Sequence, residues 1–168
     1  MFDIGEYVVY GNKGVCKVNK IGPIDIPGMS SDRQYYTLSQ VFTRGSTIFT
    51  PVDNDKSVLR RVLSSKEAKE LIDEATTMKP VWIQNDKERE QKFTETLRSA
   101  DTRSLFEMII SLYQRRERRL ADGKKATSTD ERYFHAAEDI LLGELGISLG
   151  MGKDEVKDLI IKEFDTVR

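Results

Sequence analysis

The sequence contains few of the residues that usually build catalytic or metal-binding sites. A single cysteine, Cys16, excludes an internal disulfide, and with a single histidine, His135, the chain has no Cys/His cluster with metal-ligand spacing. No apolar run approaches the roughly 20 residues of a membrane span, and the start MFDIGEYVVYG lacks the basic and apolar regions of a signal peptide. We therefore expect a cytoplasmic protein without metal or cofactor.

Enzyme motifs are also missing. The segment GISLGMGK, residues 146–153, has the ending of a phosphate-binding loop, but Ile147 replaces the first glycine and Asp154 the Ser or Thr. His135 has no nucleophile in a matching motif and is expected on the surface of a helix or half-buried. The many carboxylates alternate with Lys and Arg, as on solvated helix faces. We expect no enzymatic activity.

The charge is nearly balanced overall but not along the chain. The formal net charge is −1, yet residues 136–168 hold eight acidic and four basic residues. A nucleic-acid contact would therefore depend on a local basic patch, and would be weak on charge alone.

Residues 1 to about 60 have the pattern of a β-structure. Strand-like runs such as IGEYVVYG, VCKVNKI, QYYTLSQVF and TIFTPVDN are separated by the turn sequences GNKG, GPIDIPGMSSD and TRGS. Four or five short strands with such turns predict a small barrel or a tightly curled sheet. Pro51 is expected to end the last strand, because proline cannot donate to a ladder. Cys16 is expected to be a small buried hydrophobe.

From Ser64 onward the pattern is helical. Ser64 with Glu67 and Ser128 with Glu131 have the spacing of capping boxes, Asp101 can cap a further helix, and Asn85 or Asp86 can cap another. Apolar residues follow helical spacing in the helix after Asp101, namely Leu105, Phe106, Ile109, Leu112 and Tyr113. The fold class is thus α+β, a curled sheet over residues 1–62 followed by a compact helical domain over 63–168.

The only tryptophan, Trp82, lies in KPVWIQNDKEREQKF, between Pro80 and a charged helix. It can be a core residue, the centre of a protein interface, or an apolar wedge beside DNA. Base rates favour the core. The neighbourhood favours phosphate contact, and hence the wedge beside DNA. It contains the start of a helix with free N–H groups and the polar residues Gln84, Asn85, Lys87 and Arg89.

The run QRRERR, residues 114–119, also has two interpretations. Arginines in the last turns of a helix are stabilised by the helix dipole, and this favours a structural role for Arg118 and Arg119. For Arg115 and Arg116 the structural role and a nucleic-acid contact stay equally open.

Taken together, these segments resemble the CarD (CdnL) family of bacterial RNA polymerase-binding regulators. IGEYVVYGNKGVCKV is similar to the family's opening strand-turn-strand, and TIFTPVDNDKSVLRRVLS to the end of its first domain. The helical part is similar in the Trp before the second helix, the Arg115–Arg116 pair after an aromatic residue, and STDERYFHAAEDILLGELG. The resemblance covers nearly the whole chain.

The resemblance implies a Tudor-like barrel that binds the β-subunit lobe of RNA polymerase, and a helical domain that contacts promoter DNA at the upstream edge of the melted region. Trp82 falls at the position of the minor-groove wedge, and weak sequence dependence is expected. The residues expected at DNA are Trp82, Gln84, Asn85, Lys87, Arg115, Arg116, Lys124, Lys125 and Arg132. Those expected at polymerase are Arg33, Arg44, Ile48 and Phe49.

Gln84 and Asn85 stand where some members of that family carry arginines, and Phe49 stands where some carry a polymerase-contacting arginine. Strand alternation leaves a buried Phe49 at least as compatible as an exposed one. The expected function is that of a monomeric, non-enzymatic transcription regulator in the cytoplasm, associated with the nucleoid. The alternatives are a protein-only adaptor whose helical domain binds another protein, and a sequence-specific repressor.

Overall fold

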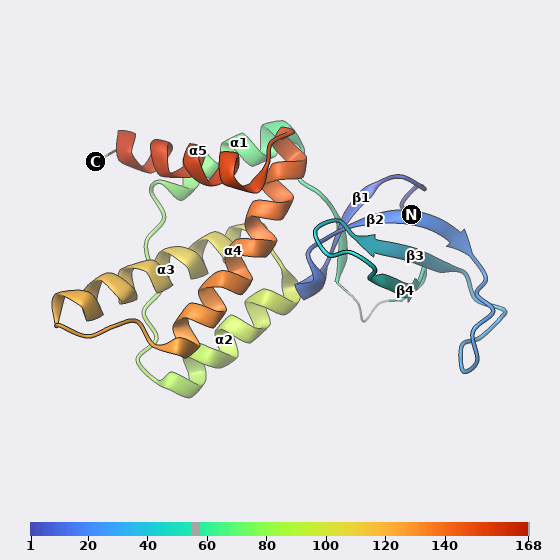
Figure 1. The fold of residues 1–168 in the computed structure, drawn as a ribbon, viewed down its shortest axis with the longest axis horizontal. Coiled ribbons are helices and arrows are strands. Elements are labelled where there is room, and N and C mark those ends of the chain that lie inside the picture. The colour runs from blue at the N-terminus through green and yellow to red at the C-terminus, as the bar shows by residue number, and fades with distance from the viewer. Residues whose placement is uncertain (55–57, 168) are drawn as a thin grey trace.

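The computed structural model describes residues 1–54 and 58–167, which form an antiparallel sheet followed by five helices (Figure 1). The strands are β1 (Tyr7–Tyr10), β2 (Val15–Gly22), β3 (Tyr35–Gln40), β4 (Thr47–Pro51) and β5 (Leu59–Arg61), with a short 3-10 helix η1 (Gly11–Lys13) between the first two. They pair in the order β4-β3-β2-β1-β5. The expected order of β then α, with a Tudor-like sheet first, is confirmed.

One strand boundary was predicted wrongly. Pro51 does end β4, but it does not end the last strand, because Leu59–Arg61 returns to pair with β1 as β5. The sequence signal is weak because β5 has only three residues, and these form a strand only through pairing with β1. Residues 55–57, inside the DNDKS part of the quoted motif, lie outside the described residues.

The helices are α1 (Ser65–Ala75), α2 (Asp86–Ser99), α3 (Thr102–Ala121), α4 (Ser128–Leu149) and α5 (Lys153–Thr166). The Ser64–Glu67 capping box and the Asp101 cap are confirmed, and Asn85 rather than Asp86 caps α2. Within the part of the chain that the structure describes, no helix has the length and apolar character to cross a membrane.

The predicted cap of the fourth helix is off by one residue. Thr127, not Ser128, is the N-cap of α4, and its hydroxyl accepts the N–H of Asp130 at 3.1 Å. Thr127 keeps an extended backbone whereas Ser128 is already helical, so a box from Ser128 to Glu131 cannot form. Tyr113 also departs from its predicted apolar stripe, since it is exposed while Leu105, Phe106 and Leu112 are buried.

The sheet has two apolar faces, and consecutive residues of β1 serve different cores. Val8 packs with Cys16, Val18, Tyr36 and Leu38 inside the curl of the sheet. Val9 faces the other way and, with its cross-strand partner Val15, joins the helical core. Side chains alternate along a strand, so these neighbouring valines point to opposite faces, and a separate core covers each of them. The sheet and the helices therefore share a hydrophobic core.

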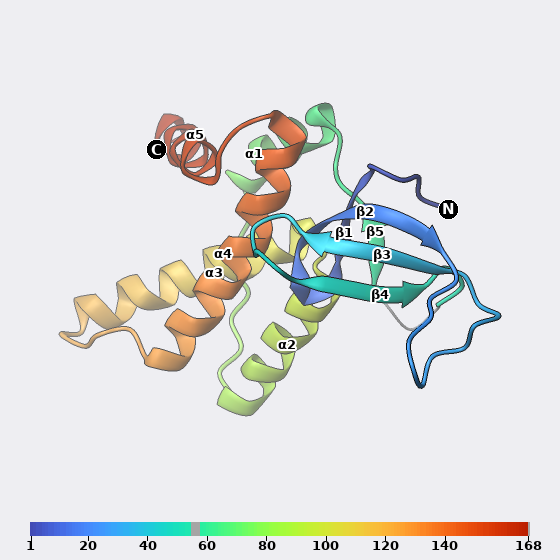
Figure 2. The ribbon, with the colours of Figure 1, turned by 45° about the vertical axis from the view of Figure 1, so that its right-hand side comes forward.

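Helix α4 lies at the centre of the helical part, and it contacts the other four helices and strand β2 (Figures 1 and 2). Two glycines allow other segments to approach it closely. A Cβ at Gly143 would lie 2.9 Å from the Phe42 ring, and one at Gly146 would lie 2.8 Å from the Met151 carbonyl oxygen. The GELG segment is thus a place where the turn after β3 and the start of α5 meet the helix.

Between these glycines, Glu144 is fully buried and binds β5. Arg60 donates to both of its carboxylate oxygens, from Nη1 to Oε2 at 2.6 Å and from Nη2 to Oε1 at 2.8 Å. Thr102 Oγ1 and the Leu63 N–H donate to the same carboxylate. This network and the shared core fix the sheet against the helices, while the boundary between 1–62 and 63–168 as independent folding units remains a prediction.

Candidate functional site

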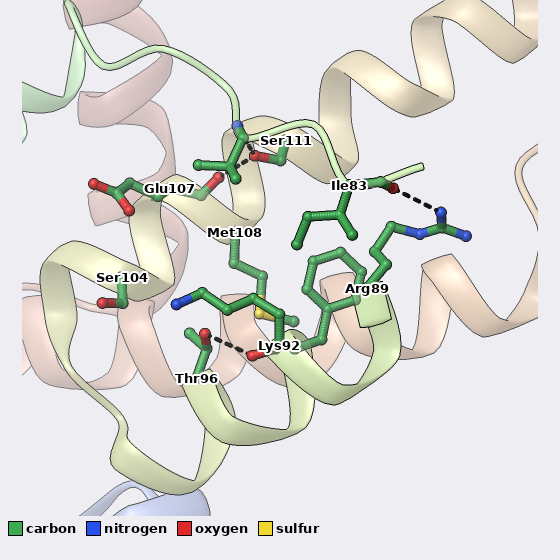
Figure 3. Close-up of a pocket in the computed structure, with 10 residues that line it drawn as sticks. Ile83, Arg89, Lys92, Thr96, Ser104, Glu107, Met108 and Ser111 are labelled. Atoms are coloured by element: carbon green, nitrogen blue, oxygen red, sulfur yellow. Dashed lines mark hydrogen bonds between the residues drawn. The ribbon is translucent and has the colours of Figure 1, made fainter. Parts of the chain in front are cut away.

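Trp82 lies on the segment that joins α1 to α2 and crosses α3. The neighbouring backbone is held on both sides, because the Val81 N–H donates to Ser111 Oγ at 2.9 Å and Arg89 Nη1 donates to the Ile83 carbonyl at 3.2 Å (Figure 3). Trp82 itself is 46% exposed. A core role is therefore excluded in the free protein, and the exposed ring stands on a fixed piece of backbone.

The space beneath this segment is small. A cavity of about 30 Å³ lies between the segment, α2 and α3, lined among others by Phe93, Met108 and Ser111 (Figure 3). Such a volume is about that of one water molecule, too little for an organic ligand. Among residues 1–54 and 58–167, no three His, Cys, Asp or Glu side chains group as metal ligands would. The chemistry of this region is that of a surface.

One arginine covers the tryptophan. The guanidinium carbon of Arg118 lies 4.2 Å from the centre of the Trp82 ring. This is a close cation–π contact, well within the roughly 6 Å at which the attraction is felt. The helix-dipole interpretation of Arg118 missed it, because nothing in the run QRRERR relates residue 118 to a loop 36 positions earlier.

The start of α2 next to Trp82 is already partly engaged. Asn85 accepts the Glu88 N–H at 3.0 Å, so its amide oxygen is used as the helix cap. Asp86 binds Arg89 at 2.7 Å, and this hydrogen bond, aided by the nearby charges of Arg89 and Arg115, lowers the pKa of Asp86 below its ordinary value. Gln84 and Lys87 are exposed beside them.

The predicted basic residues differ in how free their charges are. Arg115 Nε binds Asp130 at 2.6 Å, and both side chains are largely buried. Arg116 lies over the rings of Tyr113 and Phe134, and Arg132 lies over the ring of Tyr133; both arginines are exposed. Lys124 and Lys125 are exposed in the α3–α4 connection, at the end of the helical part remote from the sheet (Figures 1 and 2).

These residues come from helices that contact one another, since α2, α3 and α4 pack together in pairs. The structure places Gln84, Asn85 and Lys87 at the start of α2, Arg115 and Arg116 in the second half of α3, and Arg132 in the first turns of α4. An arginine lies over one face of each of three partly exposed rings, those of Trp82, Tyr113 and Tyr133. Such surfaces suit flat or anionic groups.

The residues expected at polymerase lie along one edge of the sheet. Strand β4 is an edge strand in the sheet formed by the described residues (Figure 2). Ile48 pairs opposite Leu38 and packs on the core inside the curl, whereas Phe49 pairs opposite Thr37 and faces outward, half-buried. Alternation therefore makes Phe49, not Ile48, the outward-facing apolar candidate.

The two arginines near this edge are in different states. Arg33 binds Asp53 at 2.7 Å and holds the pKa of that carboxyl below its ordinary value. Arg44 is exposed in the turn before β4.

The described residues thus form a curled antiparallel sheet joined to a helical part that carries a half-exposed tryptophan beside arginines. Residues 2–63 match the family described as the CarD-like/TRCF RID domain. Over these residues the chain is similar to this CarD-like RNA polymerase-interacting family, and the match does not extend into the helical part. Domains of this family interact with the polymerase β subunit. A comparison with curated proteins found no match for the chain.

Proposed function

We propose that this protein binds the β-subunit lobe of RNA polymerase and stabilises the open promoter complex, with Trp82 as an apolar wedge in the minor groove at the upstream edge of the melted DNA. The observation that carries the proposal is the half-exposed Trp82 on a segment held by Ser111 and Arg89, in a chain with a polymerase-interacting domain. Burying an exposed indole in a partner releases apolar surface from water.

The proposed wedge would bind closed and open promoters with different affinities. A wedge that packs against an unstacked base step costs little where the DNA is already distorted, so it binds the open form better. A ligand shifts an equilibrium only by such a difference in affinity. Tethering through the sheet raises the local concentration of a weak DNA binder, which is consistent with a net charge of −1.

On the DNA side, the proposal gives phosphate contacts to the exposed Lys87 and Arg132. One or two more come from Arg116 and from Lys124 and Lys125 at the remote end of the helices. Gln84 and Asn85 would lie beside the wedge, where Asn85 keeps its oxygen on the helix and offers its amide N–H₂. Arg115 would contact a phosphate only by sharing its guanidinium with Asp130.

On the polymerase side, the proposal uses the edge strand β4. An edge strand offers backbone groups to which another strand can be added, and the outward-facing Phe49 supplies apolar area beside it. Arg44 and Arg33 would lie at the rim, and Ile48 would support the strand from the core side. A role in transcription would place the protein in the cytoplasm, with the nucleoid.

The deciding experiment is a footprint with polymerase on a promoter that melts. Protection that extends to the upstream edge of the bubble, and that is lost in Trp82→Ala while polymerase capture is kept, supports the proposal. Polymerase binding without any added DNA protection would instead favour a protein-only adaptor. The exposed pair Val81 and Trp82 is also compatible with that adaptor, because large apolar side chains are enriched at protein hot spots.

A further inference from the structure

The segment that carries Trp82 is docked along one face of α3. Ser111, which accepts the Val81 N–H, and Arg118, which covers the Trp82 ring, are seven residues apart in the same helix. Residues at this spacing lie on the same helix face, two turns apart. Side chains of a helix also lean toward its N-terminus, so Arg118 points back along α3 toward Ser111.

Each of these contacts restricts a different part of the segment. The Ser111 hydroxyl accepts from Val81 and donates to the Glu107 carbonyl at 2.7 Å, so its direction is fixed by its own helix. Arg89 holds the Ile83 carbonyl from α2, and its side chain is only 11% exposed (Figure 3). The backbone on both sides of Trp82 is thereby set, but the ring can still rotate about its own side-chain bonds.

We propose that Arg118 is the positioning residue of Trp82, which holds the indole in the orientation used for binding and leaves its other face open for the partner. This inference rests on the function proposed above. The planar guanidinium at 4.2 Å covers one face of the ring, and a cation–π contact selects rotamers that keep that face covered. A ring already held in one orientation loses less freedom when it inserts.

A dipole role and a stacking role of Arg118 can be separated by Arg118→Lys. Lysine keeps the positive charge at the end of α3 but lacks the planar group. The matched control is Arg119→Lys, because Arg119 is the next residue of the same helix and its Nε donates to the Lys125 carbonyl instead. If Arg118 acts only through the helix dipole, Arg118→Lys should behave like the wild type and differ from Arg118→Ala. If its planar group holds the indole by stacking, both variants should lose most of the restriction on the Trp82 ring.

The first measurement uses the free protein. Trp82 is the only tryptophan, so the fluorescence of the chain reports this ring alone. We expect Arg118→Lys and Arg118→Ala to increase quenching by acrylamide and to lower the fluorescence anisotropy, while Arg119→Lys resembles the wild type. Unchanged quenching and anisotropy in both Arg118 variants would overturn the inference before any DNA is added.

The second measurement is the lifetime of the open promoter complex with the full chain and polymerase. Arg118→Lys should shorten the lifetime about two- to fivefold, as expected from an exposed cation–π contact, and Arg119→Lys should not. If Trp82→Ala shortens the lifetime but Arg118→Lys does not, the positioning role is wrong and the proposed function stands. If Trp82→Ala also leaves the lifetime unchanged, the proposed function fails, and the inference with it.

Discussion

Arg60 on β5 and Glu144 on α4 form a two-pronged ion pair across the junction between sheet and helices, although they are 84 residues apart in the chain. The arginine also donates to the Ala100 carbonyl and to Thr102 Oγ1, so one guanidinium joins β5, the α2–α3 turn and α4. The position of the sheet relative to the helical part is therefore set partly by this pair.

We predict that Glu144→Gln destabilises the whole chain. The substitution leaves the Arg60 guanidinium in a largely desolvated site with a neutral partner, and loss of one member of a buried pair typically costs about 3 to 5 kcal/mol. Urea unfolding followed by circular dichroism would measure the loss. Glu67→Gln is the matched control, because Glu67 binds Arg61 at an exposed site where solvent screens the charges, so a much smaller loss is expected.

A double variant tests whether the pair also determines geometry. Arg60→Met with Glu144→Met removes both charges at similar volume, and such replacements often restore stability. We expect its unfolding free energy to exceed that of either single variant. Equal instability of the double and single variants would show that the two residues do not act as a pair.

Trp82→Ala should separate folding from DNA binding. Since the ring is 46% exposed, its loss should change the unfolding free energy by well under the roughly 3 to 5 kcal/mol of an emptied core site. Polymerase capture should survive, and open-complex lifetime should fall about five- to 150-fold, which corresponds to about 1 to 3 kcal/mol for one base–aromatic stack. Competition-based lifetime measurements would show this.

Trp82→Phe provides the graded control, since a smaller ring still stacks and should keep part of the lifetime. A Trp82→Ala variant that loses polymerase capture while leaving promoter lifetime unchanged would place the residue at a protein interface instead.

The salt dependence of the DNA step should be shallow. Arg115 is neutralised by Asp130, so the phosphate contacts expected are those of Lys87 and Arg132 and of one or two of Arg116, Lys124 and Lys125. With a slope of about −0.9 for each phosphate neutralised, log K against log salt should fall with a slope of roughly −3 to −4. Titration of promoter DNA at several salt concentrations measures it. A slope near −8 would mean a larger basic surface, and one near zero would favour the adaptor.

We predict that ionisation of the buried Cys16 thiol lowers the unfolding free energy at alkaline pH. Burial raises the pKa of its thiol from 9.0 to about 11, so the folded chain keeps a proton that the unfolded chain releases. The protonated Cys16 thiol contributes at most about 2 to 3 kcal/mol to the unfolding free energy. This contribution is fully present below pH 9 and is lost as the pH rises through about 11. Unfolding free energies of wild type and Cys16→Ala, compared at pH 8 and pH 11, isolate it. A difference that does not shrink at pH 11 contradicts the assignment.

Local patterns in the sequence were sufficient for most of the fold. The short strands with their turns, the Ser64–Glu67 box and the caps at Asn85 and Asp101 each depend on neighbours within a few residues, so they can be read without tertiary contacts. The missed strand β5 is different, because Leu59–Arg61 is a strand only through pairing with Val8–Tyr10, about 50 residues earlier.

The candidate site could be predicted only as residue types. An exposed Trp82 follows from its polar neighbours, but its contact with Arg118 and the pairing of Arg115 with Asp130 depend on how three helices pack. Likewise VLRR and GELG lie far apart in the sequence, and only the fold brings Arg60 of one against Glu144 of the other. Long-range contacts of this kind carry no local signal.

The two-faced strand β1 has a consequence for synthesis on the ribosome. Val9 and Val15 pack in the same core as Ile140, which is made about 125 residues after Val15. At about 5 to 20 residues per second, the sheet waits roughly 6 to 25 s with that apolar face uncovered. The nascent sheet therefore keeps part of this apolar face exposed to water until α4 has been made and can complete the core.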